Sequence, residues 1–153
     1  MSRPERAVAA EPLSKQRLRV WLRLLRAHGV IERRLRDELR GHDSTLPRFD
    51  VMATLDRYRD GLRMSDLSAK LKVSNGNVTG IIERLVSEGF VERAAVASDR
   101  RAMRVRLTAA GRDRFAAMAA EHESWVNELL DGLTAPELDT LVRLLSKIGE
   151  DEA

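Results

Sequence analysis

Arginine is concentrated in one short segment of the chain, where it could bind an anion. Within "SDRRAMRVRL" (98–107), Arg100, Arg101, Arg104 and Arg106 follow one another with no carboxylate between the first and the last. A guanidinium group is always charged and donates paired hydrogen bonds that fit phosphates and guanine edges. The segment could therefore contact the backbone or a groove of a nucleic acid. The alternative is a strand face that is simply solvated.

The same segment has the pattern of a β-strand. Apolar residues at 103, 105 and 107 alternate with arginines, which is the two-residue period of a strand with one buried face. "FVERAAV" (90–96) predicts the partner strand of a hairpin, with residues 99–101 at its tip. An arginine at such a tip can enter a narrow minor groove, where the negative potential is enhanced. We expect Asp99 to pair with Arg101 and fix its direction, and Arg100, Arg104 and Arg106 to lie near phosphates.

A second polar surface is predicted on a helix in "SNGNVTGIIERLVSEG" (74–89). One face of this helix is apolar and should be buried: Val78, Ile81, Ile82, Leu85 and Val86. The opposite face holds Gly76, Gly80, Glu83, Arg84 and Ser87, with Asn77 and Thr79 on its edges. Ser74 should cap the helix, and the first N–H groups, beside Ser74 and Asn75, could bind a phosphate.

The polar face of this helix has residues suited to duplex DNA. A glycine on the solvent side of a helix costs about 1 kcal/mol relative to alanine, so Gly76 and Gly80 indicate that something approaches the backbone closely. Asn77, Thr79 and Arg84 can bind base edges and phosphates in a major groove. The alternative is a polar helix face that binds nothing.

These two segments need a scaffold, and the periodicity predicts one that is mainly α-helical. Helices are expected at 13–39, 48–58, 66–71 and 74–88, from the cap Thr108 to about Leu130, and after a capping box of Thr134 and Glu137. Two short helices joined by a tight turn and followed by a hairpin form a winged helix-turn-helix. We therefore divide the chain into a disordered tail (1–12), flanking helices (13–45 and 109–150) and a winged helix-turn-helix lobe (46–108).

The charge of the chain is unevenly distributed. The 153 residues carry a net charge of +3, but residues 121–153 hold nine acidic residues against Arg143 and Lys147. The rest of the chain is therefore strongly basic, which fits a polyanionic partner. No apolar run approaches the ~18 residues of a membrane span, and the first 15 residues lack the apolar core of a secretory signal. We expect a cytoplasmic protein with no membrane partner.

Catalysis is not expected from this sequence. The chain has three histidines and no cysteine, which excludes disulfides, thiolate redox switches and cysteine metal sites. No His-x-x-x-His pair, glycine-rich phosphate loop or nucleophile elbow is present, so we expect no catalytic residues, no cofactor and no metal. The rival to a DNA-binding protein is a winged helix that contacts another protein, and a salt titration of DNA binding would separate the two.

One continuous stretch resembles the core of the MarR family of bacterial transcriptional regulators. The stretch is "DLSAKLKVSNGNVTGIIERLVSEGFVERAAVASDRRAMRVRLTAAG", and the flanking helices extend the resemblance to about residues 13–149. The family pattern is a helix-turn-helix, "L…GfV.R", a wing with D-x-R, and "LT..G". Here these are Leu85 to Arg93, Asp99-Arg100-Arg101, and Leu107-Thr108 with Gly111. Ala97-Ser98 replaces the usual Asp-Pro at the start of the wing.

The resemblance implies a homodimer on double-stranded DNA. The flanking helices (13–45 and 109–150) would interlock with those of a second copy, and two recognition helices about 34 Å apart would read a palindromic operator. Such proteins usually repress, and a small molecule releases them. The resemblance assigns Asp99 and Arg101 to the wing, and Ser74, Asn75, Asn77, Thr79 and Arg84 to the recognition helix. Gly80, Arg100 and Arg104 complete the set of expected DNA contacts.

The resemblance also implies a ligand cleft between the dimerisation helices and the DNA-binding lobe. Its expected lining is apolar and aromatic, with His28: Trp21, Leu25, His28, Phe49, Met52, Phe115 and Met118. Arg19 and Arg23, with Arg26 and His42, could meet an anionic group. The stretch "HDSTLPRFDVMATL" (42–55) is similar to members that sense aromatic acids or their coenzyme A thioesters. The alternative is that these apolar side chains are ordinary core.

Overall fold

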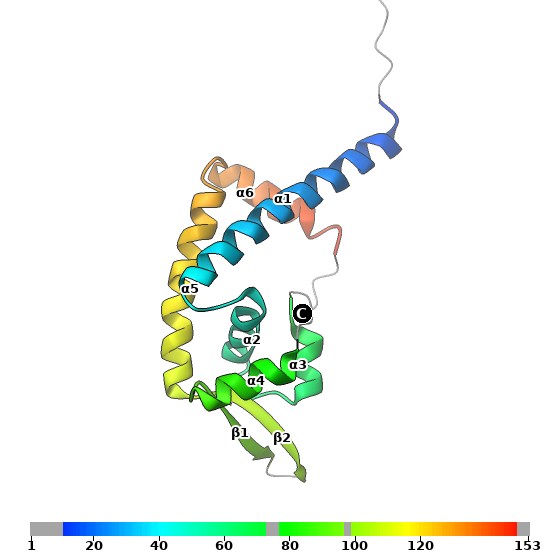
Figure 1. Ribbon diagram of the computed structural model, residues 1–153. Helices are drawn as coiled ribbons and strands as arrows, with labels where there is room; N and C mark the ends of the chain where they lie inside the picture. The colour runs from blue at the N-terminus through cyan, green and yellow to red at the C-terminus, as the bar shows by residue number, and fades with distance from the viewer. Residues whose placement is uncertain (1–10, 73–76, 97–98, 150–153) are drawn as a thin grey trace, which may run out of the picture. The chain divides into compact units, whose positions relative to one another are not determined.

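The computed structural model describes residues 11–72, 77–96 and 99–149, and the expected tail at 1–12 lies mostly outside that range. Figure 1 shows a mainly helical chain with a single hairpin in the described part, as predicted. The elements are α1 (Leu13–Gly41), α2 (Leu46–Arg57), α3 (Met64–Lys70), α4 (Val78–Ser87), β1 (Val91–Val96), β2 (Asp99–Leu107), α5 (Ala109–Leu129) and α6 (Ala135–Leu145). Residues 1–34 and 35–153 form two compact units, which are described separately.

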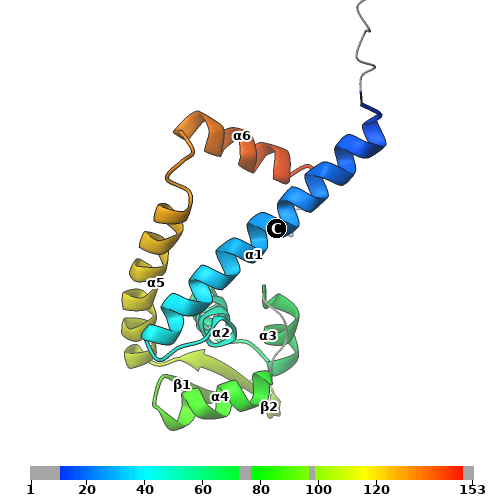
Figure 2. The same cartoon turned by 45° about the horizontal axis from the view of Figure 1, so that its top comes forward.

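Helix α2 is the centre of the second unit. Figure 2 shows it surrounded by α3, α4 and α5, and it contacts all three. Ten buried residues form the core here: Val51, Met52, Leu55, Leu62, Leu67, Ile82, Leu85, Val91, Val105 and Leu107. Burying one such aliphatic side chain contributes about 1.5–3 kcal/mol. The apolar faces of α2, α3 and α4 therefore hold the helix-turn-helix in place on the hairpin.

The hairpin is joined by a third extended segment. Strands β1 and β2 pair antiparallel from Val91 opposite Leu107, and an irregularity separates the pairs of Ala95 and Val96. Leu62 exchanges backbone hydrogen bonds of 3.0 and 2.9 Å with Val105. Gly61 precedes it with φ +89°, and a Cβ there would lie 2.9 Å from the Val105 carbonyl oxygen. This position therefore requires glycine.

The hairpin leads directly into α5 through a close contact. Thr108 caps α5 as predicted, since its Oγ1 accepts a 3.0 Å hydrogen bond from the Gly111 N–H. The same hydroxyl donates to the Gly89 carbonyl at 2.7 Å. A Cβ on Gly111 would lie 2.0 Å from the Phe90 carbonyl oxygen. The start of α5 therefore packs against the connection between α4 and β1.

Apolar side chains are exposed on both flanking helices. In the first unit these are Leu13, Leu18, Val20, Trp21, Leu22, Leu25 and Val30 of α1. In the second unit they are Leu141, Val142, Leu144 and Leu145 of α6, with Ile148 beyond its end.

The predicted capping box of α6 is present, and hydrogen bonds from Thr134 lower the pKa of Glu137. Within the described residues, no helix is both long and apolar enough to span a bilayer.

Candidate nucleic-acid interface

Helix α4 has one buried and one exposed face, as its sequence predicts. Ile82 and Leu85 are fully buried, and three further apolar residues (Val78, Ile81 and Val86) pack partly buried against the core. The exposed residues are Thr79, Glu83, Arg84 and Ser87. The apolar face fixes the helix on the lobe, and the polar face is available to a partner.

The predicted cap of this helix is wrong. Asn77 is the N-cap, and its Oδ1 accepts a 2.9 Å hydrogen bond from the Gly80 N–H. Helix α4 therefore begins at Val78 and not beside Ser74. Serine and asparagine cap helices about equally well, so local sequence could not choose between them. Ser74, Asn75 and Gly76 lie outside the described residues, and their contact with DNA stays a prediction.

The glycine at position 80 has an internal reason. A Cβ there would lie 2.6 Å from the Asn77 Nδ2 atom, so the group that approaches Gly80 closely is the capping amide of Asn77. Gly80 is also only partly exposed. The Asn77 side chain therefore explains the glycine at position 80 without a partner that approaches the backbone.

A buried carboxylate that sequence reasoning missed holds the backbone just after α3. Asp50 of α2 is 8% exposed, and its Oδ2 accepts a 2.6 Å hydrogen bond from the Lys72 backbone N–H. The Thr54 hydroxyl donates to the Asp50 carbonyl at 2.8 Å. An acidic residue inside the apolar run "FDVM" (49–52) was the available signal, because buried charge needs a specific partner.

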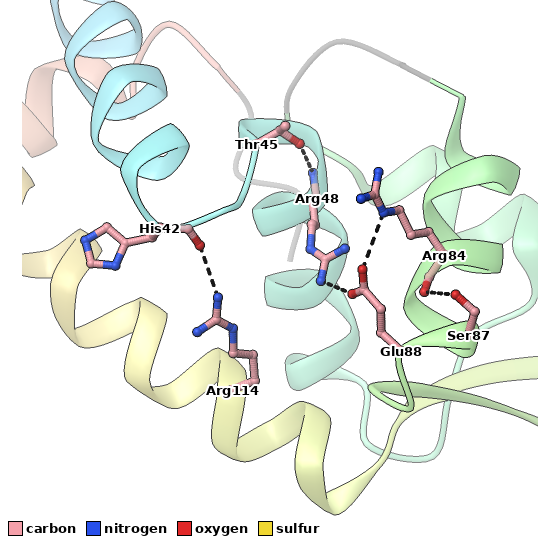
Figure 3. A network of polar contacts seen from close by, with 7 residues as sticks. All are labelled: His42, Thr45, Arg48, Arg84, Ser87, Glu88 and Arg114. Atoms are coloured by element: carbon pink, nitrogen blue, oxygen red, sulfur yellow. Dashed lines mark hydrogen bonds and ion pairs between the residues drawn. The ribbon is translucent and has the colours of Figure 1, made fainter.

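The end of α4 is tied to α2 by a carboxylate between two arginines (Figure 3). Arg48 donates through Nη2 to Glu88 Oε2, and the Arg84 Nε lies 3.4 Å from Glu88 Oε1. The hydrogen bond from Arg48 is the main cause of the lowered pKa of Glu88. The Ser87 hydroxyl donates to the Arg84 carbonyl at 2.8 Å. The predicted DNA contact Arg84 is thus exposed and held from one side.

A cationic cleft opens beside this carboxylate. Its volume is about 810 Å³, and four of its lining residues are Arg40, Arg48, Arg84 and Arg114. The Arg114 Nη2 donates to the His42 carbonyl at 3.1 Å, which joins α5 to the α1–α2 connection (Figure 3). Because the lining carboxylates, Asp43 and Glu88, are fewer than the arginines, the cleft is positively charged.

The hairpin arginines do not all have the same surroundings. Arg106 donates through Nε to Glu92 Oε1 at 2.7 Å, because the strand register places the two residues opposite each other. Arg106, which was expected near phosphates, therefore already has a carboxylate partner from the other strand, and its contact with a phosphate stays a prediction. Arg104 is partly buried, and its Nε has no partner among the described residues. The side chains of Asp99, Arg100 and Arg101 lie outside the description, so their roles stay predictions.

Known proteins share both the sequence pattern and this geometry. The pattern of the MarR family matches residues 44–103. The Multiple antibiotic resistance protein MarR of Escherichia coli is 33% identical over 122 residues, which span 76% of this chain and 81% of that protein. The chain belongs to the MarR family. The "Uncharacterized HTH-type transcriptional regulator YdgJ" of Bacillus subtilis is also 33% identical, over 106 residues that span 67% of this chain. In three curated relatives from Bacillus subtilis, including YdgJ, the match spans less than two thirds of the relative's own length: 65%, 41% and 60%.

Solved MarR-family structures superpose on most of the chain. A MarR family transcriptional regulator from Silicibacter pomeroyi is 34% identical, with a TM-score of 0.72 over 90% of this chain and 96% of that one. A mutant MarR from E. coli complexed with operator DNA is 27% identical, with a TM-score of 0.71 over 90% and 99%. The winged helix-turn-helix predicted from the sequence is therefore confirmed as the fold.

In this MarR-family chain, the expected ligand residues of the second unit lie close to the core. The Phe49 ring stacks on His122, with centroids 4.5 Å apart, and lies 5.5 Å from the Phe115 ring. Met52 and Met118 are buried, at 5% and 7% exposure. Burial also lowers the pKa of His122. The structure thus brings Phe49 and Phe115 together and places Met52 in the core cluster.

His42 also belongs to the second unit, where its ring centroid lies 5.2 Å from that of Trp125. The other expected ligand residues belong to the first unit and are exposed. Arg19 pairs with Glu11 at 2.6 Å, and the His28 Nδ1 lies 3.8 Å from Glu32. Trp21, Leu25 and Arg23 are exposed along the same part of α1. Since the two units are described separately, the expected lining stays a prediction.

Proposed function

We propose that the protein is a homodimeric transcriptional regulator that binds a palindromic site in double-stranded DNA. The observation that carries the proposal is the exposed polar face of α4, with Arg84 on it, next to an antiparallel hairpin that bears arginines. A family member with the same fold has been solved on operator DNA, which supports the assignment. The regulator would act in the cytoplasm, and it would act as a repressor.

The proposed contacts divide between a major and a minor groove. Helix α4 enters the major groove, where Thr79, Asn77 and Arg84 meet base edges and phosphates. Gly80 in the first turn of the helix, and Ser74 and Asn75, which precede the helix in the sequence, would meet the DNA backbone. On the hairpin, Asp99 orients Arg101 toward the minor groove, and Arg100 and Arg104 meet phosphates.

The flanking helices (13–45 and 109–150) would form the dimer, and residues 46–108 the DNA-binding lobe. The exposed apolar side chains of α1 and α6 support this division, because exposed apolar patches of this extent mark interaction sites. A two-fold axis would present the two α4 helices to successive major grooves about 34 Å apart. Sedimentation at micromolar concentration tests the dimer, and a monomeric mass would contradict it.

A small molecule would release the DNA, and we propose an aromatic acid or its coenzyme A thioester. The expected lining is Trp21, Leu25, His28, Phe49, Met52, Phe115 and Met118, with Arg19 and Arg23 for the anionic group. The contact between Phe49 and Phe115 supports this choice for its aromatic part. A thermal-shift screen of aromatic acids and their thioesters, followed by DNA release, tests it.

The DNA-binding proposal has a direct experiment. The wild-type protein is used to select duplexes from a pool with a random central region, and the selected duplex is titrated at several salt concentrations. A regulator that neutralises several phosphates should lose affinity with a log–log slope of about −0.9 per phosphate. A winged helix that contacts only proteins would select no sequence.

A further inference from the structure

Glu88 lies where it can control an exposed arginine of α4. Its carboxylate is shared between Arg48 of α2 and Arg84 of α4, which Figure 3 shows on its two sides. The Arg48 side chain is only 15% exposed, whereas that of Arg84 is 77% exposed. Arg48 therefore anchors the carboxylate to the lobe, and the carboxylate in turn acts on Arg84.

The contact with Arg84 leaves part of its guanidinium available. Glu88 approaches the Nε, at 3.4 Å, so the two terminal nitrogens can still form a paired contact with a phosphate or a base. The bond at Nε also restricts the orientations that the guanidinium group of Arg84 can adopt. The carboxylate also cancels part of the positive charge of the cleft that Arg40, Arg48, Arg84 and Arg114 line.

These two effects act differently on two kinds of DNA. Binding to nonoperator DNA is almost entirely electrostatic, so a carboxylate beside Arg84 weakens it. Binding to an operator also uses oriented contacts, which a fixed Arg84 favours. The lowered pKa of Glu88 agrees with a carboxylate that stays ionised at neutral pH.

We propose that Glu88 is a specificity-determining positioning residue, which holds Arg84 for operator contacts and suppresses binding to nonoperator DNA. The inference rests on the proposed function and goes beyond it, since Glu88 is not one of the expected DNA contacts. It requires the effect of Glu88 to pass through Arg84.

The test compares Glu88→Gln with the wild type on two duplexes of equal length. One duplex is selected by the wild-type protein from a random pool, and the other is its scrambled sequence. E88Q should bind the scrambled duplex about fivefold more tightly, with a salt slope steeper by about 0.9. The specificity ratio, which is the dissociation constant for the scrambled duplex divided by that for the selected duplex, should fall at least threefold. Glu123→Gln, an exposed residue of α5, is the matched control for net charge and should leave the ratio unchanged.

The dependence on Arg84 is tested by combining variants. Arg84→Gln alone should lower the ratio, and adding E88Q to it should change the ratio less than twofold. Should E88Q fail to fold by thermal melting, the pair Glu88→Asp and Glu88→Asn makes the same comparison of charge at equal size. The asparagine variant should then have the lower ratio.

Two results would overturn the inference. One is a ratio for E88Q within twofold of the wild type, and the other is an equal loss of ratio when Arg84 is already glutamine. If the wild-type protein selects no sequence from the pool, the proposed function fails and this inference fails with it.

Discussion

The Asp50 carboxylate of α2 accepts a hydrogen bond from the Lys72 backbone N–H, 22 positions away, at 2.6 Å. Lys72 follows α3, so this bond ties the turn of the helix-turn-helix to the central helix of the lobe. A hydrogen bond to a charged acceptor is stronger than one between neutral groups, and a buried carboxylate without one is costly. Asp50 therefore fixes the backbone just after α3 against the central helix.

Replacing Asp50 by alanine should destabilise the lobe. The Lys72 N–H loses its acceptor, and losing a hydrogen bond to a charged group costs about 1.5–3 kcal/mol. Urea unfolding should report this loss in the free energy of unfolding. Asp113→Ala, at an exposed position of α5, is the control and should change it by less than about 0.5 kcal/mol. Equal effects at the two positions would contradict the proposed role of Asp50.

Gly111→Ala should also destabilise the protein, although alanine favours helices. Its Cβ would lie 2.0 Å from the Phe90 carbonyl oxygen, so the start of α5 would have to move away from the connection between α4 and β1. Overpacking of this kind costs about 1–3 kcal/mol, which exceeds the helix-propensity gain of about 1 kcal/mol. Gly132→Ala, where nothing lies within 4 Å of the added Cβ, is the control. Thermal melting of both variants measures the difference, and a stabilised G111A would refute the close contact.

Short-range patterns predicted much of this architecture. The helical period identified Ile82 and Leu85 as buried, and the residue types of Thr108 and of Thr134 with Glu137 identified two caps. Each of these features depends on residues within one or two turns of the chain. Local sequence therefore contains the information that determines them.

The features that sequence did not reveal depend on pairs that only the fold brings together. Arg48 and Glu88 are 40 positions apart, and no local pattern links them. Ser74 and Asn77 were both acceptable caps, and the sequence did not decide between them. The pair of Glu92 and Arg106 could be predicted only in part. The sequence predicted the hairpin, but the strand register that sets these two residues opposite each other had first to be known.

The effect of Gly80→Ala on the free energy of unfolding should change sign when Asn77 is replaced by alanine. In the wild type, Gly80→Ala forces the Asn77 amide away and should cost about 1 kcal/mol through the lost cap. In an Asn77→Ala background the amide is already absent, so Gly80→Ala should instead stabilise by up to about 1 kcal/mol. Urea unfolding of the four proteins gives the coupling free energy. If the effects of the two substitutions on the free energy of unfolding simply add, the Asn77 amide is not the reason for glycine at position 80.

Arg101→Ala should weaken binding to a selected duplex at least tenfold while the dimer survives. The reason is the loss of a minor-groove contact at the tip of the wing, where negative potential is enhanced. Arg106→Ala is a matched control on the same strand, and its effect should be smaller because Glu92 already pairs with Arg106. Fluorescence anisotropy measures both affinities, and sedimentation checks the dimer. Unchanged affinity in R101A would show that the tip does not contact DNA.

Stability should decline in mild acid because of His122. Burial lowers the pKa of this histidine below its ordinary value of 6.5, so the folded protein binds the proton less readily than the unfolded chain does. The stability that depends on neutral His122 is therefore complete above about pH 6.5 and is lost as the pH falls through the lowered pKa. His122→Phe keeps a ring against Phe49 and removes the titration.

The melting temperature of H122F should fall less between pH 7.5 and pH 5.5 than that of the wild type, by about 2 °C or more. Ala117→Ser, at an exposed position of the same helix, adds no group that titrates in this interval and is the control that should leave the pH profile unchanged. If H122F and the wild type lose the same amount over this interval, the decline comes from another group, and the stacked pair of Phe49 and His122 has no part in it.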